Sequence, residues 1–460
     1  MTTTSLAGAL RPQMTGTVLT AEDAGFGPAT QLWNGRIGRR PALVVAPADA
    51  ADVAAAVTFA RERGLAVSVR GGGHNIAGTA LADGGLAIDM SGFRDVSVDP
   101  VERTATVGGG CRLGDVDRAT QAHGLATPLG FISRVGVAGL TLGGGLGVLT
   151  RRFGWTVDNL VAAEVVTADG AVRETSRDAE PDLFWALRGA GANLGVVTRF
   201  TYRLHRVGPD VYGGLIAWPF ERAAEVMDGY RAFTATAPRE LAVWFMLLTA
   251  PPEPFVPAEW HGRKLCAMAV CYSGDPGDGD EVVAPLRALG EPALDLLSPA
   301  PYTQIQSYLD DTEPEGMHYD WRTEYAGELT GDLLATMRDL FADCPAPMAD
   351  IGLLHLAGAL NEHADDDGAV GNRDARYVMG VKGMWPPGEP QAARFREWVA
   401  AAGDRIRPHG LGRTYINFQG PDEADDRVRA SYGANYPRLL AIKRRYDPDN
   451  VFRSNRNIRP

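Results

Sequence analysis

The sequence of 460 residues predicts an α+β protein with three stretches of different character, residues 1–210, 211–410 and 411–460. Three observations lead to this prediction. The first stretch contains a strand–helix–strand unit that runs into a glycine-rich loop. Near Gly208-Pro209 the pattern changes to long strands of antiparallel type that alternate with helices. In the last stretch it changes again, to a short strand, a helix and a tail rich in Pro and Asn.

The strand–helix–strand unit begins with an apolar run at 42–45. The helix after it carries Asp49 and Asp52 at its entry and ends at Gly64, and a β-branched strand follows at 66–69. The other predicted elements of the first stretch are short strands at 86–90 and 104–110 around the turn 99–103, a helix at 112–123, a strand with a hairpin turn at Asp169-Gly170 within 160–173, and a strand at 194–204.

The two later stretches have a different element pattern. The middle stretch is predicted to contain strands at 242–249, 264–272, 351–361 and 375–385 and helices at 219–234, 280–289, 331–342 and 389–403. The last stretch is predicted to contain a strand at 414–418 and a helix at 426–445.

Composition and charge exclude several classes of protein. With 45% apolar and 22% charged residues, the chain has the composition of a globular protein with substantial cores. The formal net charge is −12 and no long basic run occurs, which argues against nucleic acid or an anionic membrane as a partner. No window approaches the roughly 18 continuous apolar residues of a membrane span. The first residues also lack the basic start and apolar core of a secretory signal.

The 4 cysteines form no C-x-x-C pair and no cluster with histidines that would suggest a metal site. We therefore expect no metal and a reducing cytoplasm. The cysteines are Cys111, Cys266, Cys271 and Cys344.

Three consecutive glycines precede a histidine in the segment Arg70–Asn75, RGGGHN. Glycine permits positive φ and close approach by a ligand, so successive backbone N–H groups can turn toward one point. Such a nest suits a pyrophosphate, which needs many donors and little side-chain bulk. Alone, the segment is also compatible with a tight surface turn and a bystander histidine.

A second glycine-rich segment, GVAGLTLGGGLG, spans 136–147. It does not follow a first strand and open a helix with an acidic residue about 20 positions on, so it is weak evidence for a dinucleotide-binding Rossmann fold. A close-packed glycine loop is the alternative. Together with the first segment, it suggests two backbone walls around one extended cofactor.

Several spaced motifs together resemble the berberine-bridge-enzyme-like branch of the vanillyl-alcohol-oxidase flavoproteins, which have an FAD domain of the PCMH type. The resemblance runs from about residue 31 to the end and is weakest in the middle third. The segments that carry it are RGGGHN, GGLAIDMS (84–91), the glycine-rich stretch 136–170, DLFWALRGAGANLGVVTRFTYRLH (182–205), Tyr-Ile-Asn-Phe (415–418) and NYPRLLAIKRRYDPDNVFR (435–453).

The resemblance implies an FAD-binding domain in two parts, 1–210 and 411–460, and an inserted substrate domain at 211–410 whose antiparallel sheet is covered by helices. His74 sits where the family's histidine is bonded to the 8α-methyl carbon of the flavin, a bond expected to raise the flavin potential. The other residues expected to contact FAD are Arg70, Gly71, Gly72, Gly73, Asn75, Val135, Gly136, Val137, Gly139, Gly143, Gly144, Gly145, Gly147, Val165, Tyr415 and Asn417.

Two positions before the second glycine segment refine the expectation. Members with a second covalent link carry a cysteine bonded to flavin C6, and here Ile132 takes its place; Cys111 lies in a different loop. We therefore expect a single, histidyl link, as in the bacterial monocovalent branch. Val135 occupies the position that screens the flavin edge where O2 reacts, and valine resembles the oxygen-admitting members. A plain core valine is the alternative.

The implied chemistry is transfer of a hydride from a substrate carbon to the flavin, with a base that takes the accompanying proton. By resemblance, Tyr415 is the candidate base, and Asn417, two residues along the predicted strand, faces the same side. A tyrosine normally titrates near 10, so positive charge or hydrogen bonding would have to assist it.

The middle stretch offers further candidates. On the predicted strand 351–361, His355 and Asn361 share one face, which we expect to line the cavity, while Leu354 and its neighbours pack on helices. Glu362 matches the position of a family catalytic glutamate but has the opposite parity. Tyr377 and Trp385 on the next strand could contact an aromatic ligand, or they could simply pack.

These observations predict an FAD-linked oxidase that acts on a small aromatic, phenolic or alkaloid-like secondary metabolite, with O2 as acceptor and H2O2 as product. A sugar or alcohol oxidase, or a dehydrogenase, on the same scaffold is the alternative enzyme. A flavin-bearing resistance protein that sequesters a drug is the alternative of another class. The substrate and the oligomeric state stay open at this point.

Overall fold

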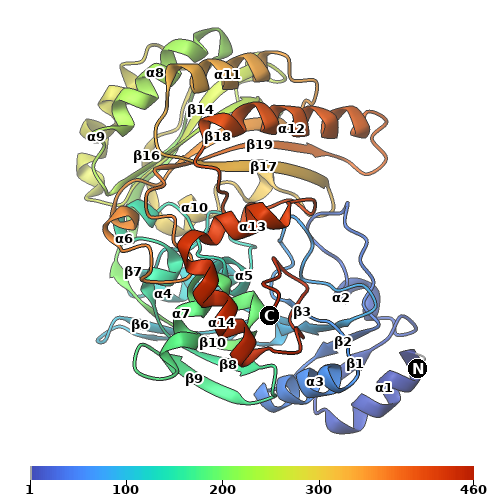
Figure 1. Cartoon of the computed structure of the whole chain (residues 1–460). Coiled ribbons are helices and arrows are strands. Elements are labelled where there is room, and N and C mark those ends of the chain that lie inside the picture. Colours follow the sequence, from blue (N-terminus) through green and yellow to red (C-terminus); the bar gives the residue numbers. More distant parts are fainter. Residues whose placement is uncertain (1–2) are drawn as a thin grey trace.

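The computed structural model describes residues 3–460, which form two halves (Figure 1). The half that holds both chain ends is called the terminal half here, and the half built from residues 210–410 the inserted half. Within residues 3–460 no helix is long and apolar enough to cross a membrane.

The terminal half is built on two sheets. A four-stranded sheet has the order β1-β2-β4-β3, with β1 Thr17–Leu19, β2 Leu43–Ala46, β3 Val67–Arg70 and β4 Leu86–Asp89. An antiparallel five-stranded sheet has the order β5-β6-β10-β8-β9, with β5 Val96–Asp99, β6 Thr104–Gly108, β8 Leu160–Thr167, β9 Val172–Ser176 and β10 Gly195–Arg203. A short pair joins β7 Leu125–Ala126 to β11 His205–Arg206.

The predicted strand–helix–strand unit is confirmed as β2, α3 (Ala50–Glu62) and β3, with β4 lying between the two strands and parallel to both. The Asp49 side chain accepts a hydrogen bond from the Asp52 N–H at 3.0 Å, which caps the helix. Gly64, with φ of +65°, follows its end.

The strands expected at 86–90 and 104–110 are present as β4 and β6. The strands expected around the turn 99–103 do not belong to one sheet, because β4 pairs with β2 and β3. The hairpin instead joins β5, which the sequence reading missed, to β6. The hairpin turn at Asp169-Gly170 is confirmed between β8 and β9.

The inserted half is an antiparallel sheet in the order β15-β12-β14-β13-β18-β19-β17, with β16 beside β12. Its strands are β12 Asp210–Pro219, β13 Leu241–Thr249, β14 Lys264–Tyr272, β15 Leu294–Asp295, β16 Ser298–Pro301, β17 His318–Ala326, β18 Ala349–His355 and β19 Tyr377–Trp385. Helices α8 Ala223–Thr234, α9 Gly279–Arg287, α11 Gly331–Ala342 and α12 Ala392–Ile406 cover its outer face (Figure 1). The other face lies toward the terminal half, as the predicted α+β fold requires.

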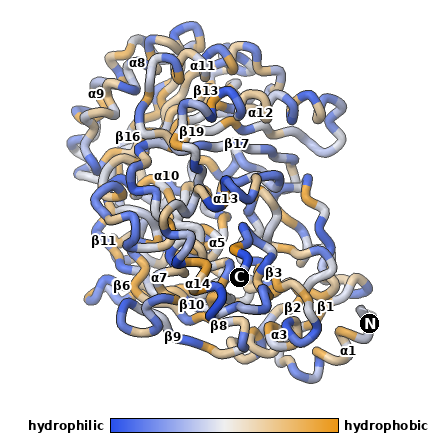
Figure 2. The backbone as a smooth tube through the Cα atoms, in the orientation of Figure 1, coloured by the Kyte–Doolittle hydropathy of each residue, from blue (hydrophilic) through white to orange (hydrophobic). Residues whose placement is uncertain are grey.

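Both faces of this sheet are buried. The outer-face residues Ile351, Leu353 and Val381 share a core with α8, α11 and α12. The tube in Figure 2 is accordingly hydrophobic along the inner strands and hydrophilic along much of the outer loops. Because both faces are buried, the sequence of a strand does not show which of its two faces lies toward the helices and which toward the terminal half.

The remaining helices connect these layers. They are α1 Thr3–Leu10, α2 Phe26–Ala29, α4 Leu113–Gln121, α5 Val137–Leu142, α6 Thr150–Phe153, α7 Pro181–Ala190, α10 Tyr302–Gln306, α13 Asp425–Tyr432 and α14 Tyr436–Tyr446.

The C-terminal segment returns to the terminal half (Figure 1). The single helix predicted at 426–445 is two, because Gly433, with φ of +51°, separates α13 from α14. The predicted strand 414–418 is wrong: its second part is a 3₁₀ turn, Ile416–Phe418. The buried Lys443 ammonium ties the segment down, since it donates to Asp447 at 2.6 Å and to the backbone oxygen of Asn193 at 2.9 Å.

Candidate functional site

The main cavity lies where the two sheets of the terminal half meet the inserted half. The terminal half supplies most of its walls, and Glu313 and Trp321 come from the inserted half. The lining segments of the terminal half are Val67–Val69 of β3, the loop 71–75, the loop 130–136, helix α5, the turn around 189–195, and the C-terminal segments 415–418 and 452–456.

The two glycine segments of the sequence meet in this cavity. A Cβ on Gly72 would fall on the backbone of Gly136, and a Cβ on Gly136 would fall on the backbone of Gly72. Gly73 has φ of +70°, which glycine adopts without strain. Gly139 borders the cavity, and a Cβ there would meet nothing within 4 Å. The predicted pair of backbone walls is therefore present, and a ligand can approach it closely.

Some residues expected to contact the cofactor do not line the cavity. Arg70 turns to Asp89, with 3.3 Å between the guanidinium and the carboxylate. Val137 and Val165 are fully buried in the core beneath. The three glycines after Gly143 also lie outside the lining: Gly144 abuts Val370, Gly145 abuts Thr156, and Gly147 abuts the backbone of Leu129. The expected residues that do line the cavity are Gly71, Gly72, Gly73, His74, Asn75, Val135, Gly136, Gly139, Gly143, Tyr415 and Asn417.

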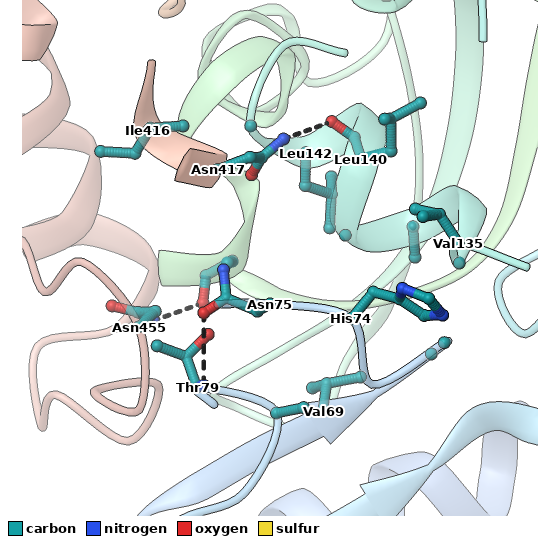
Figure 3. A pocket seen from close by; sticks show the side chains of 18 of the residues that line it. Val69, His74, Asn75, Thr79, Val135, Leu140, Leu142, Ile416, Asn417 and Asn455 are labelled. Atoms are coloured by element: carbon teal, nitrogen blue, oxygen red, sulfur yellow. Dashed lines mark hydrogen bonds between the residues drawn. The ribbon is translucent and has the colours of Figure 1, made fainter. Parts of the chain in front are cut away.

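His74 projects into the cavity below Val135 (Figure 3). Its ring stacks on Trp33, with ring centroids 5.5 Å apart. Burial, with smaller contributions from Arg112 and Arg134, lowers the pKa of His74 to about 4, so the imidazole is neutral at neutral pH. Its Nε2 atom is buried and has no hydrogen-bond partner in the described part of the chain. A neutral imidazole nitrogen without a partner is free to form a bond.

Ile132 and Val135 line the cavity on the loop before α5. Among the residues that the structure describes, no cysteine lines it. Cys111 is fully buried elsewhere, and burial raises the pKa of its thiol to about 12, which makes it unreactive. Among the described lining residues a cysteinyl link therefore has no candidate, whereas His74 offers a neutral imidazole.

Tyr415 and Asn417 meet at the cavity wall formed by the 3₁₀ turn. The Tyr415 hydroxyl accepts hydrogen bonds from the Gly145 N–H at 3.0 Å and from Asn417 Nδ2 at 2.9 Å. Asn417 Nδ2 also donates to the Leu140 oxygen at 3.0 Å (Figure 3). Burial raises the pKa of Tyr415 above its usual value, and the two donors act in the opposite direction. The hydrogen bonding that the sequence reading required is present, without a cation.

His355 does not reach the cavity, which corrects the sequence reading. It shares the outer face of β18 with Ile351 and Leu353 and stacks on Tyr377, with ring centroids 5.1 Å apart. The Tyr377 hydroxyl in turn lies 2.9 Å from that of Thr234 in α8. Burial lowers the pKa of His355 to about 2, so the imidazole is neutral there.

The other candidates of the inserted half are also outside the cavity. Trp385 packs edge-on against Phe395 of α12, with 6.2 Å between ring centroids. Asn361 holds the 3₁₀ turn Ala359–Glu362 by donating to the backbone oxygen of Arg373 at 2.6 Å. Glu362 is exposed and pairs with Arg239 at 3.0 Å. The strand predicted at 351–361 ends at His355. The alternation of side chains between the two faces of the strand therefore does not extend to Asn361 or Glu362.

Several residues that line the cavity were not predicted from the sequence. Trp33, Phe131 and Trp321 give the cavity aromatic walls, and Glu313 adds a carboxylate. Phe131 lies next to Ile132 and could have been suspected from that position, whereas nothing near Trp33, Glu313 or Trp321 in the sequence marks them, because only the fold brings their segments together. The C-terminal wall at 452–456 could have been suspected from the closing motif.

These features fit FAD. The crossed glycine segments offer backbone donors at close range for a pyrophosphate, and the apolar walls suit aromatic rings. The unpartnered Nε2 of His74 is an orphaned polar atom inside the same cavity.

Comparison with known proteins agrees with this fit. Residues 41–176 match the family described as FAD binding domain, and residues 414–459 the family described as berberine and berberine like. An FAD-linked oxidoreductase of Dictyostelium discoideum is 31% identical, covering 93% of this chain and 91% of that protein. The (R)-6-hydroxynicotine oxidase of Paenarthrobacter nicotinovorans is 30% identical, covering 97% of both.

Solved structures have the same fold. The crystal structure of 6-hydroxy-D-nicotine oxidase from Arthrobacter nicotinovorans superposes with a TM-score of 0.85 at 26% identity, covering 97% of this chain and 98% of that one. The predicted fold class, a PCMH-type FAD domain with an inserted antiparallel sheet domain, is thereby confirmed. The chain belongs to the berberine-bridge-enzyme-like family of FAD-linked oxidoreductases.

Proposed function

We propose that this enzyme is an oxidase that holds FAD covalently through His74 alone. Its substrate would be a small aromatic, phenolic or alkaloid-like metabolite, with O2 as acceptor and H2O2 as product. The observation that carries the proposal is the neutral, buried imidazole of His74 with its unpartnered Nε2 beside the crossed glycine segments. The aromatic lining and the relative named as a hydroxynicotine oxidase support an aromatic substrate.

Bound FAD would supply an acceptor for a hydride from a substrate carbon and, once reduced, a donor of electrons to O2. The chain's own residues do the rest. Tyr415 lines the cavity with its phenolic oxygen held by two donors, so in its phenolate form it can receive the proton of a substrate O–H or N–H and become a neutral phenol. Asn417 holds that hydroxyl in place through its own bond to Leu140. The aromatic walls offer flat apolar surfaces on which a ring can pack.

The attachment is tested by acid precipitation. If His74 carries the flavin, the denatured pellet stays yellow and a tryptic peptide containing His74 has the added mass of FAD. The His74→Ala variant should still fold and bind FAD weakly, because the glycine segments remain, and its pellet should be colourless. Release of all FAD from the wild-type pellet would contradict the covalent link.

We also infer a reducing compartment, and place the enzyme in the cytoplasm. The 4 cysteines are all free, and Cys111, Cys266 and Cys271 are buried. We expect no change in thermal stability when a reductant is added, and a marked loss on reduction would contradict the inference.

A further inference from the structure

One part of the cavity wall, formed by Glu313 and Trp321, is polar, whereas most of the remaining lining is apolar; this part is called the polar pole here. Glu313 lines the cavity, and its Oε2 atom is buried without a hydrogen-bond partner among the described residues. Trp321 also lines the cavity, and its Nε1 donor is likewise buried and unpartnered. A buried polar atom without a partner costs about 1–3 kcal/mol, so two such atoms on residues that line one cavity point to a ligand that supplies the missing partners.

The charge of this pole is negative. Lys382 lies between two carboxylates: it donates to Glu313 Oε1 and pairs with Asp350 at 2.8 Å. The strands set this arrangement, because Lys382 is in register with Asp350 on β18 and with Trp321 on β17. With both carboxylates ionised, the shared ammonium leaves one negative charge; burial raises the pKa of Glu313, and the Lys382 ammonium acts in the opposite direction. His74 is neutral at neutral pH and does not cancel it, and the Arg456 guanidinium in the C-terminal wall of the cavity donates to the backbone oxygens of Gln419 and Gly420.

The backbone around Glu313 is fixed independently of its side chain. The Trp33 indole donates to the backbone oxygen of Glu313 at 3.0 Å, and the Tyr319 hydroxyl donates to that of Pro314 at 2.6 Å. On the other side, Asp310 accepts from the Ser133 N–H at 2.7 Å, next to the loop that carries Val135. The segment 310–317 is therefore fastened to the terminal half at Trp33 and at the loop 130–136, and a change of the Glu313 side chain alone should leave its path intact.

We propose that Glu313 and Trp321 form the substrate-recognition pole of the cavity and select a small aromatic molecule that carries a protonated amine. The ammonium would donate to Glu313 Oε2 and lie near the indoles of Trp33 and Trp321, whose ring centroids are 5.7 Å apart. The Trp321 Nε1–H would donate to an oxygen or nitrogen acceptor of the same molecule. This deepens the proposed function and rests on it, because it places the substrate in the cavity that holds FAD.

The test compares two probes of equal size, 2-phenylethylamine and 2-phenylethanol, by their effect on the visible spectrum of the oxidised holoenzyme and by calorimetry. At pH 7 the amine is a cation and the alcohol is neutral. The wild type should bind the amine at least tenfold more tightly. Glu313→Gln keeps the size of the side chain but removes its negative charge. An amide NH2 group takes the place of one carboxylate oxygen, either the unpartnered Oε2 or the Oε1 that accepts from Lys382. It should weaken amine binding about 10- to 100-fold, as for a hydrogen bond to a charged group, and change alcohol binding less than threefold.

Glu315→Gln is the matched control. Glu315 is exposed, lies two residues along the same loop and does not line the cavity, so its variant should leave both affinities unchanged. Equal affinity of the wild type for the two probes, or no binding of either, overturns the proposal, as does an equal loss of both in Glu313→Gln. If Glu313→Gln fails to fold, the ratio of the wild-type affinities for the amine and the alcohol decides whether the proposal holds. The binding measurements need only oxidised enzyme with FAD bound. Their outcome therefore does not depend on whether FAD is covalently linked or on how fast the reduced enzyme reacts with O2.

Discussion

At the scale of single residues, Tyr415 is subject to two opposing influences. Burial stabilises the neutral phenol, while the Gly145 N–H and Asn417 Nδ2 both stabilise the phenolate. Burial prevails, because the pKa of Tyr415 is raised above its usual value. If the residue is the base, its active form is a minor species at neutral pH, and catalysis should increase as the pH rises.

Tyr415→Phe removes the hydroxyl and preserves the ring that stacks on Trp155. We expect flavin reduction to slow by roughly 10²–10⁴-fold, the usual contribution of a general base, with FAD content and substrate binding almost unchanged. The wild-type rate should rise with pH between 7 and 9, and the variant's should be flat. Anaerobic stopped-flow measures both. A variant that keeps the wild-type rate and pH dependence would make Tyr415 a structural residue.

Val135 tests the reaction with oxygen. It is half-buried and lines the cavity beside His74 (Figure 3). Val135→Leu adds bulk at this point, so reoxidation of the reduced enzyme by O2 should slow at least tenfold while anaerobic reduction by substrate stays within threefold. Val197→Leu, at another lining position on β10, serves as the control. If both half-reactions of Val135→Leu fall together, the residue does not control access of O2.

At the scale of elements, the crossed glycine segments depend on two backbones in contact. Gly136→Ala places a Cβ on the backbone of Gly72. Overpacking of this kind costs about 1–3 kcal/mol, and we expect a lower melting temperature of the holoenzyme and less FAD per chain. Gly8→Ala is the control, because a Cβ there meets nothing within 4 Å and alanine favours the helix α1. Normal FAD content in Gly136→Ala would show that the loops can separate without loss.

The strands show how far pattern reasoning reaches. The strand patterns predicted β13, β14 and β19 to within a few residues, and alternation was then used to assign the faces of β18. It could not tell which face of β18 meets the cavity, because Leu354 on the inner face is as apolar as Leu353 on the outer one. His355 was therefore assigned to the wrong face. The 3₁₀ turn at 416–418 was also missed, although the pairing of Tyr415 with Asn417 was expected and the hydrogen bond at 2.9 Å joins them.

At the scale of the whole molecule, the cavity is assembled from segments that are distant in the sequence. His74 was predictable because its glycine neighbours form a motif that resembles a known family. Glu313 and Trp33 were not, because their proximity depends on how the inserted half sits on the terminal half. The domain boundaries at 210 and 410 stay a prediction. The structure shows that the strands of the large sheet fall within Asp210–Trp385.

The contact between the two halves includes a buried carboxyl group, Asp117 of α4. Gln306 of α10 donates to its Oδ2 atom at 3.4 Å, and its Oδ1 atom has no partner among the described residues. Burial raises the pKa of Asp117 to about 7, and the hydrogen bond from Gln306 opposes this only in part. The folded protein therefore binds a proton that the unfolded chain has already released at pH 5 or 6.

The sign of the effect on stability follows from this difference. The pKa of Asp117 is higher in the folded state than in the unfolded chain, so the native protein binds the proton more strongly. The free energy of unfolding therefore falls as the pH rises from about 4 to about 7 and is constant above that range. A shift from 3.8 to about 7 corresponds to at most about 4 kcal/mol. Asp117→Asn mimics the protonated form, so it should approach the wild type near pH 4 and exceed it by about 1–4 kcal/mol at pH 8.

Asp115, two residues earlier in α4, provides a control of opposite sign. Burial raises the pKa of its carboxyl, but hydrogen bonds from Arg94, at 2.6 Å, and from the Arg112 N–H outweigh this and lower it overall. Its carboxylate therefore contributes stability above its unfolded pKa and loses it as the pH falls. Asp115→Asn should be less stable than the wild type at pH 8, with a difference that shrinks below pH 4. Denaturant unfolding of both variants across pH 4–8 gives the comparison. If Asp117→Asn gains nothing at pH 8 while Asp115→Asn loses stability as expected, then Asp117 is ionised in the folded protein, and water enters between the two halves to solvate it.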